Sequence, residues 1–236
     1  VVEEAAVAWL EGLGYQIRFG PDIAPGELHA ERGSYDEVVL AGRLREAIDR
    51  LNPQIPEEAK EEAFRKVTIL NEPSLVRNNR AFHKFLTDGI PVEYQGDEGR
   101  VISDIVRLFD FADIENNDWL AVNQFTVIEG DHNRRPDIVI FVNGLPLVVI
   151  ELKNPADENA TVQKAFTQLQ NYKNAIPSLF YYNAALVASD GLDARAGTIS
   201  SGISRFMAWK SSDGFNEDKA TTPQIETLIK GMLNGP

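Results

Sequence analysis

The segment PDIVIFVNGLPLVVIELK, residues 136–153, constrains the fold more than any other part of the chain. Two runs rich in β-branched residues flank Asn143-Gly144, a dipeptide that favours the left-handed positions of a tight hairpin turn. The second run is apolar at four consecutive positions, Leu147 to Ile150, as expected of a central strand covered on both faces. The segment therefore predicts an antiparallel strand pair in the middle of a covered sheet.

Helices and further strands are predicted on both sides of this hairpin. Apolar residues recur at helical spacing in 2–12, in three segments between 37 and 87, in 161–176 and near the end of the chain. Segments 90–95, 100–109, 118–128 and 184–191 favour strands, and RFMAWK at 205–210 favours an edge strand. The sequence therefore predicts an α/β fold with a central mixed sheet flanked by helices, plus a small helical N-terminal subdomain.

Charged residues appear abruptly at one end of the hairpin. Glu151 directly follows the apolar run, Lys153 lies two residues further on, and Asp137 opens the partner strand. Residues two apart in a strand point the same way, so Glu151 and Lys153 share a face if the strand continues that far. A two-residue loop would send Asp137 to the opposite face, whereas an odd-length loop or a bulge would bring it to the same face. A shared site therefore predicts an odd-length loop or a bulge.

Two carboxylates beside a lysine suit one kind of chemistry and also have a purely structural explanation. Half-buried carboxylates repel each other, and a bound Mg²⁺ ion removes that cost while polarising a phosphate and acidifying a bound water. The lysine can orient or deprotonate that water and offset the phosphate charge. Asp137, Glu151 and Lys153 thus suit phosphodiester hydrolysis. Spacing alone equally allows a salt bridge at a strand end with Asp137 capping the hairpin.

Pro136-Asp137 and Glu151-Leu152-Lys153 match the P-D…(D/E)-x-K signature of a nuclease superfamily. The chain resembles the N-terminal nuclease domain of the restriction (R) subunit of type I restriction enzymes in segments along its whole length. These segments include VEEAAVAWLEGLGY, RLREAIDRLNP, LVRNNRAFHKFLTDGI, NDWLAVNQFTVIEG and SLFYYNAALVASDGLDARAG. The resemblance implies a restriction-endonuclease-like core in a single domain, residues 1–236, with 35–90 as a helical insertion and 118–210 as the catalytic core.

The resemblance also implies further site residues. A glutamate on the first helix often completes the metal site in this family, and Glu3 matches it, with Glu4 as the alternative. A Gln-x-x-x-Tyr motif is matched by Gln168 and Tyr172, which lie four residues apart and so share a helix face. There an amide and a phenol can position the lysine or contact the DNA backbone. Taken alone, a tyrosine such as Tyr172 is more often a core aromatic with its hydroxyl at the surface.

Basic residues near these motifs are candidate DNA contacts. Arg134 and Arg135 come just before Asp137, and Lys164 and Lys173 lie in the helix that carries the Gln-x-x-x-Tyr motif. Each could contact phosphate, although exposed basic side chains are commonly only solvated. The formal net charge of -13 argues against a domain that grips DNA by itself. Either the positive charge is local, or other domains and subunits hold the DNA.

Composition narrows the setting in which such a domain works. The chain has no cysteine, which excludes disulfides, Cys-ligated zinc and thiol nucleophiles. It has no apolar run long enough for a membrane helix and no secretory signal, so we expect a soluble cytoplasmic protein. It begins at Val1 rather than Met and so suggests a fragment.

The resemblance implies a larger parent protein. No G-x-x-x-x-G-K-[ST] motif occurs, so ATP would act only through helicase-like motor domains elsewhere in that parent. The implied partners are double-stranded DNA and the methyltransferase (M) and specificity (S) subunits. Two other functions remain open at this point. One is a nuclease-like docking or DNA-binding module that does not cut, and the other is a stand-alone structure-specific or repair nuclease.

Overall fold

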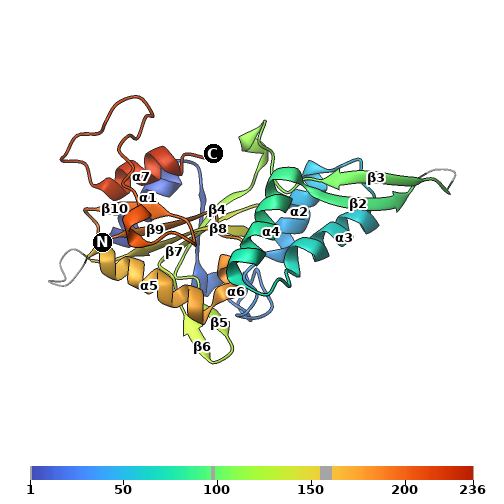
Figure 1. Ribbon diagram of the computed structural model, residues 1–236, viewed down its shortest axis with the longest axis horizontal. Coiled ribbons are helices and arrows are strands. Elements are labelled where there is room, and N and C mark those ends of the chain that lie inside the picture. Colours follow the sequence, from blue (N-terminus) through green and yellow to red (C-terminus); the bar gives the residue numbers. More distant parts are fainter. Residues whose placement is uncertain (1, 97–98, 155–160, 236) are drawn as a thin grey trace.

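A mixed six-stranded sheet forms the centre of the molecule, for which a computed structural model describes residues 2–96, 99–154 and 161–235 (Figure 1). Its strands lie in the order β1 (Gln16–Phe19), β4 (Trp119–Asn123), β7 (Ile138–Val142), β8 (Leu145–Leu152), β9 (Ala185–Ser189) and β10 (Ala194–Gly197). The pairs β1–β4 and β8–β9 are parallel, and the other neighbours are antiparallel. The predicted α/β fold with a central mixed sheet is confirmed.

Helices cover the sheet on both faces. These helices are α1 (Val2–Gly12), α5 (Val162–Ala175), α6 (Pro177–Phe180) and α7 (Gln224–Met232). Helices α1 and α7 pack together on one side, and α5 packs against β8 and β9 on the other (Figure 1). Every residue of β7, β8 and β9 is buried. The prediction of a central, doubly covered hairpin is therefore confirmed.

A second group of elements lies beside the sheet. It comprises α2 (Ala41–Leu51), α3 (Glu57–Thr68), α4 (Leu75–Asp88) and the antiparallel pair β2 (Ile90–Gln95) and β3 (Val101–Val106), seen on the right of Figure 1. Helix α3 packs on β2. The three predicted helices are present, and their buried apolar residues join the same hydrophobic cluster as the sheet. This second group of elements, the lobe, thus shares one continuous core with the sheet. The division into a helical insertion at 35–90 and a catalytic core at 118–210 stays a prediction.

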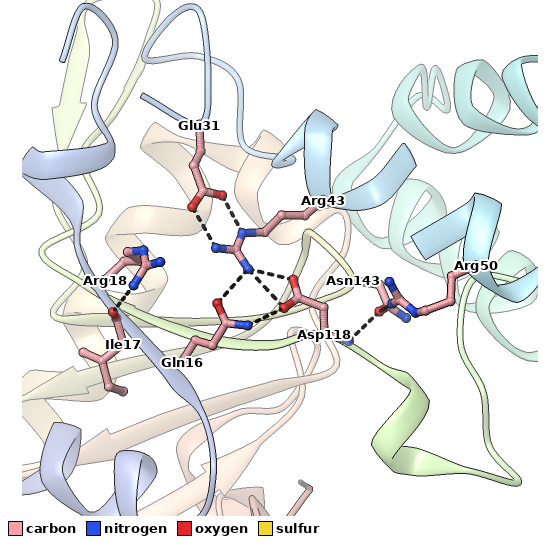
Figure 2. A network of polar contacts seen from close by, with 8 residues as sticks. All are labelled: Gln16, Ile17, Arg18, Glu31, Arg43, Arg50, Asp118 and Asn143. Carbon is pink, nitrogen blue, oxygen red and sulfur yellow. Dashed lines mark hydrogen bonds and ion pairs between the residues drawn. The ribbon is translucent and has the colours of Figure 1, made fainter. Parts of the chain in front are cut away.

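Arg43 of α2 attaches this lobe to the sheet (Figure 2). Its guanidinium donates to Glu31 through Nε at 2.5 Å and through Nη2 at 2.8 Å, and to the Asp118 carboxylate through Nη1 at 2.9 and 3.0 Å. Gln16 of β1 also contacts Asp118. Hydrogen bonds to Glu31 and Asp118 raise the pKa of Arg43 although burial opposes them. A charge that is paired on two sides in this way fixes α2 to the start of β4.

The turn of the central hairpin packs against the start of α2. Asn143 and Gly144 both have left-handed backbone angles, with φ of 52° and 78°. The buried Asn143 side chain accepts from the Asp118 amide at 2.8 Å and from Arg50 Nη2 at 3.2 Å, and the Leu40 amide donates to the Gly144 carbonyl at 2.9 Å. The Asn-Gly signal thus reflects both turn geometry and the close approach of α2.

Some elements differ from the sequence predictions. RFMAWK does not form the edge strand, because only Met207 bridges to Ala196, and the edge is β10. Segment 118–128 is broken at Gln124, which has φ of 58°, into β4 and β5 (Val127–Glu129), and β5 pairs with β6 (His132–Arg134). Short 3-10 helices occur at Gly20–Ile23, Ile114–Asn116 and Ile203–Arg205. No helix of the described residues has the length and apolarity needed to cross a bilayer.

Candidate active site

A bulge in β8 sets the register of the central hairpin. Next to the two-residue turn, Val142 pairs with Leu145, and further from the turn Ile140 pairs with Val148 and Ile138 with Ile150. The register therefore shifts by one residue within β8. In the shifted register Asp137 comes opposite Glu151 and on the same face. The sequence predicted an odd-length loop or a bulge, and the structure contains the bulge.

Polar contacts from a neighbouring segment hold the bulge in place. The Leu147 carbonyl accepts from the Ala184 amide at 2.7 Å and from Asn183 Nδ2 at 3.2 Å. The Asn183 carbonyl in turn accepts from Asn79 Nδ2 at 2.7 Å and lies 2.9 Å from His83 Nε2. Helix α4 therefore braces the segment that satisfies the bulge, although α4 lies in the lobe beside the sheet.

Asp137, Glu151 and Lys153 come together at the open end of the hairpin. The Leu152 amide donates to Asp137 Oδ2 at 2.7 Å, and Lys153 Nζ donates to Glu151 Oε1 at 2.6 Å. The Lys153 amide continues the pairing with β9 by donating to the Ser189 carbonyl at 2.8 Å. The backbone pairing thus continues to the Lys153 amide, one residue beyond β8, and Glu151 and Lys153 lie on one face, as the spacing predicted.

The surroundings of the Glu151 carboxylate disfavour its ionised form. Its side chain is 3% exposed, its buried Oε2 atom accepts no hydrogen bond of normal geometry from the described residues, and the Tyr172 hydroxyl lies close enough to lower the pKa of Glu151. Burial, followed by the nearby charge of Asp137, raises the pKa of Glu151 from 4.5 to about 7, against the opposing effect of Lys153. Burial likewise raises the pKa of Asp137, with Glu3 adding to the shift. A buried carboxylate oxygen without a donor is where a cation lowers the free energy most.

Raised carboxylate pKa values make the stability of the metal-free chain pH-dependent. A carboxyl whose pKa is higher in the folded state stabilises the fold below its unfolded pKa, and that contribution is lost as pH rises through the folded pKa. We expect the metal-free chain to lose on the order of 2 kcal/mol of stability between about pH 5 and about pH 8 from Glu151. Thermal unfolding in EDTA across this range measures the loss.

Glu151→Gln is the matched control for this pH dependence, because it removes the titrating group and keeps the shape. The difference in unfolding temperature between the native chain and this variant should grow with pH. Acidic residues with lowered pKa values, such as Asp213 and Asp218, lose their contribution only at more acidic pH. Parallel curves for the two chains between pH 5 and 8 would contradict the prediction.

Helix α5 brings the Gln-x-x-x-Tyr motif to this site. Thr161 caps the helix by accepting from the Lys164 amide at 3.2 Å, and Gln168 and Tyr172 then lie on one face. Burial, followed by the charge of Glu151, raises the pKa of Tyr172, and the Gln168 side chain opposes this rise. The Tyr172 hydroxyl also lies 3.4 Å from the Arg135 carbonyl. Both motif residues therefore lie within interaction range of the carboxylate pair.

The structure distinguishes the two glutamates of α1. Glu3 is half-buried and accepts from Asn123 Nδ2 at 2.9 Å and from Gln124 Nε2 at 2.7 Å, and its charge raises the pKa of Asp137. Glu4 is exposed. Sequence reasoning missed Asn123 and Gln124, although a polar pair at the end of the apolar β4 is the same kind of signal as Glu151 at the end of the apolar run of β8.

The basic candidates divide into two groups. Arg135 is exposed and lowers the pKa of Asp137, so it lies close to the carboxylates. Arg134 donates to its neighbour, the Asn133 carbonyl, at 2.8 Å. Lys164 is exposed in the first turn of α5. All three remain candidates for contact with phosphate.

Lys173 is positioned differently from the other basic candidates. Its Nζ donates to the Ile199 carbonyl at 2.6 Å, and partial burial lowers the pKa of this lysine. The neighbouring Tyr172 faces the carboxylates, and one residue along a helix corresponds to a rotation of about 100°. The structure therefore does not bring Lys173 into the site.

The donors at the site fit a hard divalent cation. Asp137 and Glu151 supply carboxylate oxygens, and the partnerless Oε2 of Glu151 is an available ligand atom. Within the described ranges no three His, Cys, Asp or Glu side chains form a ready metal-binding cluster. Two protein carboxylates completed by water and substrate oxygens are what Mg²⁺ accepts, whereas a structural zinc site needs a full protein set.

The fold and the comparisons agree on the class of protein. A mixed sheet flanked by helices, with charged residues at the end of its central hairpin, is a restriction-endonuclease-like core. Residues 1–205 match the family model described as "Type I restriction enzyme R protein N terminus". The chain belongs to this family.

Relatives in bacteria and archaea carry similar names. The chain is 41% identical over 236 residues to the type I restriction enzyme HindI endonuclease subunit of Haemophilus influenzae, covering 99% of this chain and 22% of the relative. It is 35% identical over 213 residues to a putative type I restriction enzyme MjaIXP endonuclease subunit of Methanocaldococcus jannaschii, covering 89% and 20%. The chain thus spans about a fifth of the length of these two relatives.

Proposed function

We propose that this chain is the DNA endonuclease domain of a type I restriction enzyme and that it hydrolyses phosphodiester bonds with Mg²⁺. The observation that carries the proposal is the buried Glu151 carboxylate, which has one partnerless oxygen and lies beside Asp137 and Lys153. Membership of the family and the names of its relatives support the restriction role.

Asp137 and Glu151 would hold the ion, with Glu3 rather than Glu4 as the third carboxylate near it. When bound, Mg²⁺ supplies Lewis-acid stabilisation of the phosphate and lowers the pKa of a coordinated water. Lys153 lies on the same face, and its ammonium group would donate hydrogen bonds to the attacking water or to the phosphate oxygens. It would exchange its present partner, Glu151 Oε1, for these groups.

Gln168 and Tyr172 would act on the same cluster from α5. Their position beside Glu151 lets them orient Lys153 or donate to a DNA phosphate oxygen. Arg135 is the basic residue best placed to contact a phosphate near the scissile bond, with Arg134 and Lys164 as weaker candidates. Lys173 would have to release the Ile199 carbonyl first.

The acidic net charge supports a division of labour in the parent protein. At a formal charge of -13, this domain would be held on DNA mainly by other parts of the enzyme. We propose that motor domains elsewhere in the parent couple ATP hydrolysis to DNA translocation, and that M and S subunits supply recognition in the cytoplasm. Sequence specificity would then lie outside this chain.

The test is a cleavage assay on the reconstituted full complex with Mg²⁺ and ATP. Asp137→Ala and Lys153→Ala should each abolish cutting while ATP hydrolysis continues at the native rate. The ATPase readout controls for assembly, because a complex that has not formed would lose both activities. Unchanged cutting in either variant would refute the catalytic assignment and favour a docking module. Full cutting by the isolated chain without motor or ATP would instead favour a stand-alone nuclease.

A further inference from the structure

The end of β4 contacts both Glu3 of the first helix and the backbone of Asp137, the residue before β7. Asn123 and Gln124 follow the buried residues of β4 and each donates a side-chain amide hydrogen to a different oxygen of Glu3. Both oxygens of the Glu3 carboxylate are therefore fixed by neutral donors. Neutral amides fix the direction of a carboxylate without neutralising its charge, so Glu3 stays available to a cation.

Gln124 is tied to Asp137 through its backbone as well. Its amide donates to the Asp137 carbonyl at 2.9 Å, while its side chain donates to Glu3 at 2.7 Å. One residue thus hydrogen-bonds both the Glu3 carboxylate and the backbone carbonyl of Asp137. Its two donors set the separation between the Glu3 side chain and the Asp137 backbone.

The local backbone is built to keep Gln124 in this position. Gln124 has φ of 58°, a left-handed conformation that a non-glycine residue adopts at a cost. A β-carbon at Gly20 would lie 2.3 Å from the Gln124 carbonyl oxygen, so only glycine lets the 3-10 helix after β1 pack there. The left-handed conformation at Gln124 thus falls on the residue that links the Glu3 carboxylate to the Asp137 backbone.

Resting on the function proposed above, we infer that Gln124 is a positioning residue that orients the Glu3 carboxylate beside Asp137 for a divalent cation. Asn123 supports the same carboxylate from the adjacent position. Donors that orient a metal ligand typically change metal affinity by 10- to 100-fold when they are removed. Gln124 would act through Glu3, without touching the reacting atoms.

The left-handed backbone of Gln124 offers a clean test. Gln124→Gly removes the amide side chain and adopts the same φ without strain, so the fold should be kept. Gln124→Asn keeps an amide on a residue that tolerates this conformation. We would titrate the 236-residue chain with Mn²⁺ by calorimetry and record its thermal unfolding in EDTA. The Mn²⁺ dissociation constant of Gln124→Gly should rise by about 10- to 100-fold with an unchanged unfolding temperature.

Each outcome has a distinct meaning. Partial recovery of Mn²⁺ affinity in Gln124→Asn would support positioning by the amide. Native affinity in Gln124→Gly, or a large drop in its unfolding temperature, would overturn the inference in favour of a structural role. Asp137→Asn serves as the control for the proposed function. If Asp137→Asn binds Mn²⁺ as tightly as the native chain, or the native chain does not bind it, the metal site itself is wrong.

Discussion

Replacement of Glu151 by glutamine should lower DNA cleavage by the full complex by about a thousandfold or more while making the metal-free domain more stable near pH 8. Glutamine has nearly the same shape but cannot offer a charged ligand. It also removes a buried carboxylate that has a partnerless oxygen and a pKa of about 7. Relief of that buried charge should add about 1–2 kcal/mol of stability. Cleavage rates and thermal unfolding in EDTA measure the two effects.

The opposite signs of these two effects make the prediction specific. If Glu151 only stabilised the fold, its replacement would make the chain less stable. A Glu151→Gln variant that is both inactive and destabilised would therefore argue against a metal-binding role. Glu93→Gln is the matched control, because Glu93 is an exposed glutamate in β2, remote from the hairpin. It should change neither cleavage nor unfolding. Mg²⁺ should raise the unfolding temperature of the native chain and leave that of Glu151→Gln almost unchanged.

Gly144→Ala should destabilise the chain by about 3 kcal/mol or more and lower its unfolding temperature by roughly 6–12 °C. Two costs combine at this residue. Its φ of 78° is unfavourable for alanine, and a β-carbon would lie 2.5 Å from the Leu40 carbonyl oxygen and 2.8 Å from the Leu44 amide nitrogen. Because both contacts are backbone atoms of α2 or its cap, the whole helix start would have to move.

Gly26→Ala separates the two costs. Gly26 has a similar φ of 88°, but a β-carbon there would meet nothing within 4 Å. It should therefore lose only about 1 kcal/mol, the cost of the left-handed conformation itself. Equal unfolding temperatures for the two variants would show that the approach of α2 to the hairpin turn costs nothing, contrary to the geometry. Calorimetric or circular-dichroism melts are sufficient for this comparison.

Local signals predicted the parts of the fold that depend on local chemistry. The Asn143-Gly144 turn and the apolar run of β8 identified the central hairpin, and helical periodicity located α1 to α5. The face shared by Asp137 and Glu151 could be stated only as a condition on the register. The bulge that meets it depends on Asn183 and Ala184, which lie far along the chain from β8.

Elements defined by distant pairing escaped prediction. β1 is short and mostly exposed, and it becomes a strand only because β4 lies parallel beside it. β10 occupies the edge that was assigned to RFMAWK, because a short ARAG segment returns directly from β9. The hydrogen bonds from Asn123 and Gln124 to Glu3 connect residues separated by about 120 positions, and no pattern in a single sequence relates them.

Because of the bulge in β8, the two carboxylates of the motif share a face only when their residue numbers differ by an even number. Asp137 and Glu151 are separated by an even number of positions, and a two-residue turn alone would bring together only residues separated by an odd number. A relative with one residue fewer in this hairpin would need no bulge to bring its two carboxylates together. A relative that kept the bulge after such a loss would retain every signature residue and lack the site that the signature denotes.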